Sequence, residues 1–397
     1  MPRWSTVIAV LLTWNALPWL VLGGLFAPML PGGWALVLPL ALLVLMPIVV
    51  LIRSFGGRGY PSAPTRLFVL RPFWYTQLFL PLLGAGGALG FLVGLSFGSP
   101  TGVGRWAVGA LAGVLALGAL WGYAGTRRLV VKSLDVSFPD LPSGLAGLRI
   151  AQLSDLHVGP HTSRRHLARV VDAVRAAAPD LIALTGDQVD DFARDVEPLG
   201  AALGGLTAPL GVIAIAGNHD VYAGWTAVRR GMEEIGWTVL VNGALPLERN
   251  GTRFWVAGTG DPAGYGGPTG PDPAVVPDIQ RTLAGVPAGA FTLALAHNPA
   301  LWPGLAARGV ALTLSGHTHY GQLSIPRLGW SVASAFLEHA MGVHRLGDSV
   351  LYINPGTNFW GIPFRIGALP EVTVVTLHRT VTTSSLAGSV SAAVEEL

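Results

Sequence analysis

The sequence contains no cysteine, and its first 134 residues contain no aspartate or glutamate. The absence of cysteine excludes disulfide bonds and thiolate metal ligands, so any metal must be held by His, Asp, Asn or Glu. The absence of acids divides the 397 residues into two unlike parts. Nine basic residues precede Asp135, whereas the remaining 16 are outnumbered by all 22 acids after that point.

The chain is basic overall, with a net charge of +3 and an isoelectric point near 9.5. Such values can indicate nucleic-acid binding when the basic residues gather on a folded domain. Here the basic excess lies between apolar segments of the first part, and the second part is acidic. The charge distribution therefore argues against a nucleic-acid partner.

Four long apolar runs occupy the first part of the chain, at residues 7–30, 34–52, 73–95 and 106–123. Each is close to the ~20 residues that cross the hydrocarbon core of a bilayer as a helix. A cleaved signal peptide would explain only the first run. Buried helices of a soluble domain are the other alternative, but such a domain would not lack acids entirely. We therefore predict four transmembrane helices in residues 1–123, with the lipid bilayer as a partner.

The placement of basic residues predicts the orientation of these helices. One basic residue, Arg3, precedes the first run. Four lie between the second and third runs, namely Arg53, Arg58, Arg66 and Arg71. Three follow the fourth run, namely Arg127, Arg128 and Lys132. The positive-inside rule then puts the N-terminus and the second part on the cytoplasmic side. The runs carry no charge within the membrane, which favours an anchor over a transporter.

The second part has the pattern of an α/β fold. Residues 124–147 are predicted as a linker, because Pro139 and Pro142 interrupt regular structure. In residues 148–380, short β-rich apolar runs alternate with helical patterns. One such helix follows Ser163, a predicted N-cap. The segment 381–397 is small and polar and is predicted as a flexible tail.

Five apolar runs of the second part end in side chains that can bind metals. Those side chains fall in the segments SDLH (154–157), TGDQVD (185–190), GNHD (217–220), HNP (297–299) and GHTH (316–319). In open α/β sheets, ligands bind outside the carboxyl ends of the strands. Each residue alone has a structural explanation, such as a helix cap, a turn or a core histidine. Five coincidences at equivalent positions favour one shared site.

The composition of this set fits two cations. Nitrogen and oxygen donors without thiolate suit Mn, Fe or Zn better than Mg alone. Two such metals can share a carboxylate and activate a water as the nucleophile. Because side chains alternate along a strand, His317 and His319 are expected on the same side, each reaching one metal.

The ordered motifs DLH, GDQVD, GNHD, AHNP and GHTH resemble the calcineurin-like dinuclear metallophosphoesterases over residues 148–377. The Gln after GHTH and the segment from Asn354-Pro355-Gly356 to Pro370-Glu371 resemble the membrane-anchored bacterial phosphoesterases in particular. The resemblance implies an α/β fold, a two-sheet β-sandwich flanked by helices, here preceded by the four transmembrane helices. It also implies an integral protein of the bacterial cell membrane.

The resemblance also implies roles for individual residues. The first metal would be held by Asp155, His157, Asp187 and His319, and the second by Asp187 as the bridging ligand with Asn218, His297 and His317. His219 matches the residue that protonates the leaving oxygen, and Asp190 matches the carboxylate that orients it.

Two further residues are predicted to contact substrate. Arg365 is a candidate contact for the substrate phosphate, with an ordinary surface arginine as the alternative. Tyr320 replaces the usual glycine after the second histidine and is expected in the pocket wall. The chain lacks the Arg-Gly that protein phosphatases of the superfamily carry after GDxxD. It has His219 where the UDP-diacylglucosamine hydrolases carry arginine.

The resulting hypothesis is a membrane-anchored hydrolase of a phosphodiester, pyrophosphate or phosphomonoester, which acts by attack of a metal-bridged hydroxide on phosphorus. A lipid substrate is favoured because the bilayer would concentrate it beside the site. One alternative is a tethered hydrolase of soluble nucleotides or phosphodiesters. The alternative of another class is a catalytically silent membrane scaffold or sensor.

Overall fold

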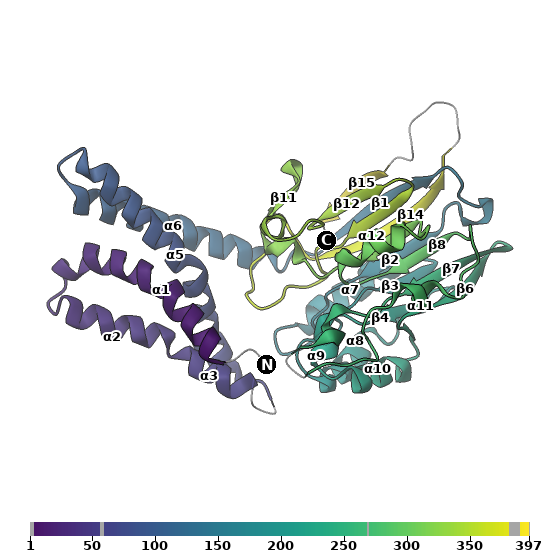
Figure 1. Cartoon of the computed structure of the whole chain (residues 1–397), viewed down its shortest axis with the longest axis horizontal. Coiled ribbons are helices and arrows are strands. Elements are labelled where there is room, and N and C mark those ends of the chain that lie inside the picture. The colour runs from purple at the N-terminus through teal and green to yellow at the C-terminus, as the bar shows by residue number, and fades with distance from the viewer. Residues whose placement is uncertain (1–3, 56–58, 268–269, 381–389, 397) are drawn as a thin grey trace. The chain divides into compact units, whose positions relative to one another are not determined.

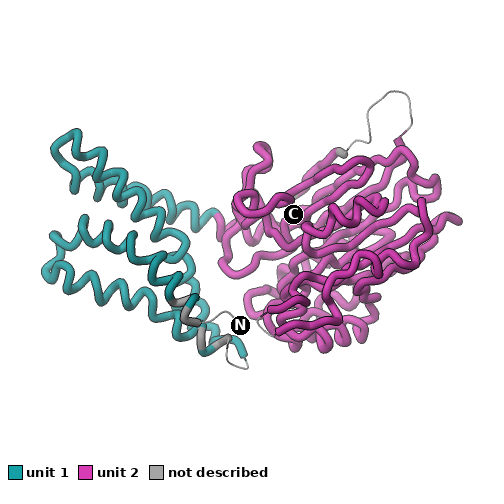
Figure 2. Tube along the Cα trace, in the orientation of Figure 1, with its two compact units in different colours: residues 1–121 teal, residues 122–397 magenta. Residues whose placement is uncertain are grey.

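The computed structural model describes residues 4–55, 59–267, 270–380 and 390–396. The chain divides into two compact units, with the boundary between Trp121 and Gly122 (Figure 2). We call residues 1–121 unit 1 and residues 122–397 unit 2.

Unit 1 is helical. Its helices are α1 (Trp4–Phe26), α2 (Trp34–Leu45), α3 (Pro47–Phe55), α4 (Ala63–Thr65), α5 (Arg71–Leu95) and most of α6 (Pro100–Gly125). Four helical spans are long and apolar enough to cross a membrane: Ala9–Met29, Trp34–Leu51, Ala63–Leu95 and Pro100–Gly125. These spans coincide with the four predicted runs, and the last two begin earlier than the apolar pattern suggested.

Unit 2 contains two large β-sheets (Figure 1). The first has the order β15-β1-β14-β2-β3-β4-β5, and the second has the order β12-β13-β9-β8-β7-β6. The strands of the first sheet are β1 (Val130–Phe138), β2 (Arg149–Leu153), β3 (Leu181–Leu184), β4 (Val212–Ile215), β5 (Thr238–Leu240), β14 (Glu371–Arg379) and β15 (Val390–Glu396). Those of the second are β6 (Gly243–Arg249), β7 (Thr252–Gly258), β8 (Thr292–Leu295), β9 (Leu312–Ser315), β12 (Gly342–Leu346) and β13 (Ser349–Ile353).

The two sheets pack face to face around one hydrophobic core. Leu181 and Ile213 of the first sheet share this core with Leu293 and Leu312 of the second. Helices α7 (Arg164–Ala177), α8 (Val196–Leu203) and α10 (Trp225–Glu234) cover the other face of the first sheet. The short helices α11 (Ile279–Leu283) and α12 (Trp302–Ala306) pack against the second. This architecture confirms the predicted two-sheet sandwich flanked by helices.

Helix α7 shows how local sequence fixes these elements. The Ser163 side chain accepts a hydrogen bond from the His166 N–H at 3.1 Å, which caps the first turn as predicted. Val170 and Val174 lie on the face that packs against the first sheet, and both are buried. Ser163 thus marks the start of the helix, and the 3.6-residue period determines its buried face.

The predicted linker and tail differ from the structure. Residues 124–147 contain β1, which pairs with β14 in parallel and with β15 in antiparallel orientation. The alternation of Leu134, Val136 and Phe138 with polar residues is a strand pattern, and all three side chains are buried. Within the predicted tail, residues 390–396 form β15, whereas 381–389 and 397 lie outside the described residues.

Candidate metal centre

Parallel strands bring the predicted ligands to one edge of each sheet. In the first sheet, Leu153 pairs with Leu184, and Leu184 pairs with Ala214, so β2, β3 and β4 end together. In the second sheet, Leu295 pairs with Leu314, so β8 and β9 also end together. The side chains that follow these strands are consequently close in space, as the strand-end pattern predicted.

The first predicted set of ligands is closely spaced. Nε2 of His157 lies 3.1 Å from Nε2 of His319, which lies 3.3 Å from Oδ1 of Asp155. Oδ2 of Asp187 lies 3.6 Å from Nε2 of His157. Asp155, His157 and His319 form one group whose donor atoms could hold a single cation.

The second predicted set shares Asp187 with the first. Oδ2 of Asp187 lies 3.3 Å from Nε2 of His297. Oδ1 of Asn218 lies 3.2 Å from the same nitrogen and 2.8 Å from Nδ1 of His317. On the other side of the ring, Nδ1 of His297 lies 2.8 Å from the Thr185 carbonyl oxygen. Nδ1 donates a hydrogen bond to that carbonyl, so Nε2 is the nitrogen that faces Asp187 and Asn218.

These spacings fit two metal ions. Metal–ligand distances of about 2.0–2.2 Å place neighbouring ligands about 3.0–3.5 Å apart in octahedral or tetrahedral geometry. The donor separations within each set are 2.8–3.6 Å. Because Asp187 belongs to both sets, it is positioned to bridge the two ions.

The electrostatics of the cluster also favour cations. Burial alone would raise the pKa of Asp187, but His297 and His219 hold the pKa well below its usual value, so the carboxylate is ionised. Burial alone would lower the pKa of His297, but Asp187 raises the pKa well above its usual value. Burial lowers the pKa of His317 to about 4, which keeps that ring in the neutral form that binds metals.

The backbone at these positions is strained. Five of the seven predicted ligands have positive φ angles, between 42° and 72°: Asp155, His157, Asp187, His317 and His319. This left-handed region is uncommon for residues with a Cβ. Residues held there cluster at functional sites, where the surrounding structure enforces the conformation. The strain thus marks the same residues that the sequence motifs identified.

Two glycines of the motifs allow the close approach of chain segments. A Cβ on Gly217 would lie 2.2 Å from Oδ1 of Asp187, and a Cβ on Gly316 would lie 2.2 Å from Oδ2 of Asp155. Both distances are far below van der Waals contact. The glycines of GNHD and GHTH therefore leave room for the carboxylates of the neighbouring strands.

His317 and His319 do not lie on a strand, so the prediction that strand alternation directs them is wrong. Strand β9 ends at Ser315, and both histidines follow it with positive φ angles. The backbone turn after β9, and not the alternation of side chains along a strand, sets the directions of the two histidine rings. His317 is directed at Asn218 and His319 at Asp155, and their assignment to two different metals stays a prediction.

His219 is placed differently from the prediction with respect to Asp190. Nδ1 of His219 lies 2.8 Å from the main-chain carbonyl oxygen of Asp190, not from its carboxylate. The Asp190 carboxylate lies 3.5 Å from Nδ1 of His157 instead, and Asp191 Oδ1 lies 3.9 Å from Nδ1 of His219. The carboxylate therefore faces a predicted ligand, because the backbone turn after β3 directs it away from His219.

Burial dominates the protonation of His219. It lowers the pKa of His219 below its usual value, although Asp187 and Asp190 act to raise it. Asp220 has a structural role: its carboxylate accepts hydrogen bonds from the N–H groups of Gln188, Val189 and Gly217. It joins the loop after β3 to the loop after β4.

The structure contradicts the prediction that Arg365 contacts substrate phosphate. Its side chain is completely buried. The guanidinium donates hydrogen bonds to the carbonyl oxygens of Pro355, Asn358 and Ala368 and contacts Nδ1 of His319 at 2.8 Å. Arg365 is a positioning residue behind a predicted ligand. The sequence does not reveal this burial, because the acceptors are main-chain carbonyls, which every residue carries.

The structure also contradicts the placement of Tyr320 in the pocket wall. Its ring is buried in a cluster with Trp302, Leu351 and Ile353. Its hydroxyl donates to the Ile353 carbonyl at 2.6 Å and accepts from the Gly342 N–H at 2.9 Å. The positive φ of 53° turns the side chain into this core.

Two residues near the centre escaped the sequence analysis. The Ser154 hydroxyl donates to Oδ2 of Asp155 at 2.6 Å and so orients that carboxylate. The Trp360 ring, about half exposed, lies 5.5 Å from the His219 ring and 6.5 Å from the His157 ring. Ser154 adjoins a motif and could have been found, whereas Trp360 lies far away in sequence.

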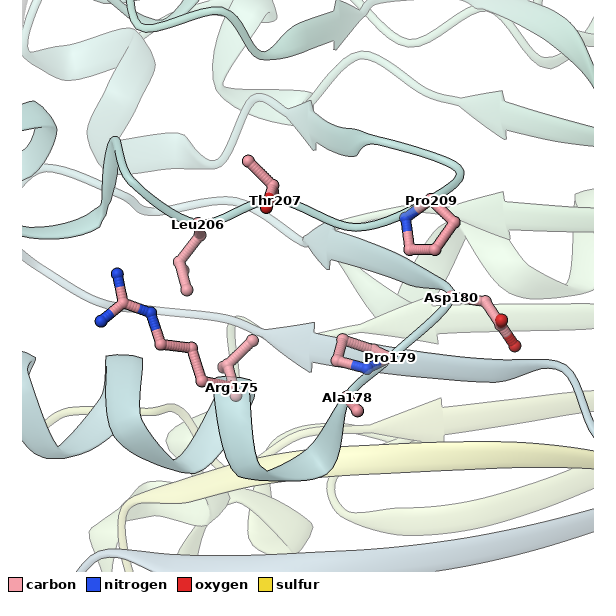
Figure 3. A pocket seen from close by; sticks show the side chains of 8 residues that line it. Arg175, Ala178, Pro179, Asp180, Leu206, Thr207 and Pro209 are labelled. Carbon is pink, nitrogen blue, oxygen red and sulfur yellow. The ribbon is translucent and has the colours of Figure 1, made fainter.

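A separate hollow of about 300 Å³ lies at the opposite ends of the strands, before β3 and β4 (Figure 3). It is lined by Arg175, Pro179, Asp180, Leu206 and Pro209 among others. None of the predicted site residues lines it. The hollow is therefore distinct from the candidate metal centre.

Comparisons with known proteins agree with this geometry. A sequence profile of the calcineurin-like phosphoesterases matches residues 148–321. The uncharacterised metallophosphoesterase YkuE of Bacillus subtilis is 32% identical over 287 residues, which cover 68% of this chain and 95% of YkuE. A transmembrane protein with metallophosphoesterase domain from Danio rerio is 32% identical over 269 residues, which cover 62% of this chain and 57% of the relative. The chain thus spans just over half of the fish protein.

Among solved structures, the calcineurin-like phosphoesterase YfkN of Bacillus subtilis aligns with a TM-score of 0.35 at 14% identity, over 63% of this chain and 90% of that one. The extent of the match to YkuE is what establishes the relationship. The chain belongs to the calcineurin-like phosphoesterase family.

Proposed function

We propose that this chain is a metal-dependent phosphoester hydrolase that its N-terminal helices anchor in a membrane, and that its substrate is a lipid phosphoester. The single observation that carries the proposal is the convergence of two ligand sets on the shared carboxylate of Asp187. The mixed nitrogen and oxygen donors suit Mn, Fe or Zn. When bound, two such cations would neutralise the phosphoryl oxygens and lower the pKa of a coordinated water.

In this proposal the protein side chains orient the ligands and move one proton. Because the Asp190 carbonyl accepts a hydrogen bond from Nδ1 of His219, the Nε2 atom is free to protonate the leaving-group oxygen. A buried imidazole with a lowered pKa is a stronger acid when it is protonated. Burial of the centre excludes water and strengthens each electrostatic contact.

Support for a lipid substrate comes from the four helical spans long and apolar enough to cross a membrane. A bilayer would concentrate a lipid next to unit 2. The distribution of Arg53, Arg66, Arg71, Arg127 and Lys132 around these spans supports a cytoplasmic position for unit 2. Protease added to sealed inverted vesicles should then cleave unit 2, and protection would contradict this orientation.

The central experiment measures hydrolysis by the full chain in detergent with Mn²⁺, on bis(p-nitrophenyl) phosphate and on lipid phosphoesters. Asp187→Asn should lose bound metal and activity together. His219→Gln should keep its metal and lose about 10²–10⁴-fold in rate. His378→Gln, an exposed histidine paired with Asp135, is the matched control. An unchanged rate for His219→Gln would remove its assigned role, and absence of activity on every substrate would favour a silent scaffold.

A further inference from the structure

Unit 2 carries a concentrated apolar surface between the GHTH motif and β12. Of the nine exposed large hydrophobic side chains that the structure describes in unit 2, five lie within residues 325–337. Their exposed fractions are 81% for Phe336, 75% for Leu328, 46% for Ile325, 43% for Trp330 and 41% for Leu337. The segment IPRLGWSVASAFL contains one charge, Arg327, and no acid. Such a concentration marks an interaction surface.

This segment, which we call the apolar hairpin (Ile325–Leu337), is an ordered element. Strands β10 (Ser324–Ile325) and β11 (Trp330–Ser331) pair in antiparallel orientation, with Ile325 opposite Trp330. The turn between them closes through Gly329, at a φ of 62°. Figure 1 shows the β11 segment projecting from the body of unit 2. The exposed hydrophobic side chains of this segment are therefore carried by an ordered, hydrogen-bonded backbone.

The base of the apolar hairpin is tied to the segment around Arg365. The Gln322 side-chain amide donates to the carbonyl oxygens of Trp360 and Ile362 at 3.0 and 3.2 Å. The Ser324 N–H donates to the Ile366 carbonyl oxygen at 2.9 Å. The hairpin and residues 360–366 thus form one connected structure.

Residues 360–366 in turn contact the last turn of α6, which belongs to unit 2. The Arg365 N–H donates to the Gly122 carbonyl oxygen at 2.8 Å. The Phe364 ring packs so closely that a Cβ on Gly122 would lie 2.4 Å from it. Since α6 is one of the helices long and apolar enough to cross a membrane, its last turn would lie at the membrane surface. The base of the hairpin would then lie near the same surface.

We propose that the apolar hairpin inserts into the interfacial layer of the bilayer and holds the metal centre against the lipid surface. Aromatic and aliphatic side chains beside a single arginine are the composition that interfacial elements use. Trp360, held by Gln322 at the hairpin base, lies beside His219 at the metal centre. A lipid headgroup next to the hairpin would therefore be near the site. The inference rests on the proposed function in two respects, that α6 crosses a membrane and that the substrate is a lipid.

The absence of cysteine in the chain allows a direct test with the full chain in lipid nanodiscs. Leu328→Cys is labelled with an environment-sensitive fluorophore, and Glu248→Cys, at an exposed position on β6, is the matched control. The Leu328 label should show blue-shifted emission and quenching by lipids with a nitroxide about 5–10 Å below the headgroups. The Glu248 label should show neither. Emission typical of water at both positions would overturn the proposal, and a blue shift without lipid quenching would assign the surface to a second protein copy instead.

A second measurement separates docking from catalysis. In Leu328→Asp and Phe336→Asp, the ratio of the rate on a bilayer lipid phosphoester to the rate on bis(p-nitrophenyl) phosphate should fall about tenfold, from lost apolar burial. An unchanged ratio would overturn docking and leave hydrolysis intact. If wild-type chain hydrolyses neither substrate, the proposed function fails, whereas the fluorescence result still decides whether the hairpin enters the bilayer.

Discussion

Replacement of Arg365 tests whether this residue supports the fold or binds substrate. Its guanidinium is buried and donates to four buried main-chain carbonyls, those of His319, Pro355, Asn358 and Ala368. Arg365→Met would leave these acceptors without a donor, at a cost of about 1–3 kcal/mol each. Removal of a buried charge offsets part of this cost. We expect a net destabilisation of about 3–5 kcal/mol.

The assay is thermal unfolding of the full chain in detergent, followed by tryptophan fluorescence. For a domain of this size, the expected loss corresponds to a fall in the unfolding midpoint of about 10 °C. Arg365→Lys should recover part of the loss, because an ammonium can donate to several carbonyls. Arg345→Met, at an exposed position on β12, is the control and should change the midpoint little.

The same variants distinguish the two roles of Arg365 in kinetics. If the role of Arg365 is structural, folded Arg365→Lys should retain the KM of the wild type for a phosphodiester. If it contacts the substrate phosphate, the midpoint should stay within the range of the control while KM rises. That second outcome would refute the structural reasoning.

Two further predictions concern a close approach and a buried carboxyl. Gly217→Ala would place a Cβ 2.2 Å from Oδ1 of Asp187, so bound metal measured after dialysis should fall, whereas Gly285→Ala, with open space around it, should not change it. Burial raises the pKa of Asp261 from 3.8 to about 6. Since the folded state then holds the proton more tightly, this group costs stability as pH rises from about 4 to 6, and the cost is complete above that. The stability of Asp261→Asn relative to wild type should therefore increase by about 2 kcal/mol between pH 4 and pH 7. A pH-independent difference in denaturant unfolding would contradict the assigned cause.

The sequence predicted the parts of the centre that depend on strand ends. A buried strand such as Leu181–Leu184 is recognisable from its apolar run, and parallel strands in register must bring their following residues together. The type of each side chain then limits its chemistry. For that reason the sequence is enough to predict the two sets that share Asp187, and their role as metal ligands stays a prediction.

The errors arose where a role depends on contacts between distant segments. Arg365 and Tyr320 were placed toward substrate, but the structure directs both into the protein. The Asp190 carboxylate faces His157 rather than His219, because of the backbone turn that follows β3. Strand β1 has a local alternating pattern, but Pro139 and Pro142 directly after it led to the prediction of a linker instead.

The sequence by itself determined the fold class, the four apolar spans and the set of candidate metal ligands. These follow from hydrophobic periodicity and from donor chemistry, which are local properties of the chain. Only the tertiary structure decided which way Arg365 and Tyr320 point. It also decided that the apolar hairpin is joined through Gln322 and Arg365 to the end of α6. The direction of a side chain depends on backbone turns and on packing between segments far apart in the sequence, which no local pattern records.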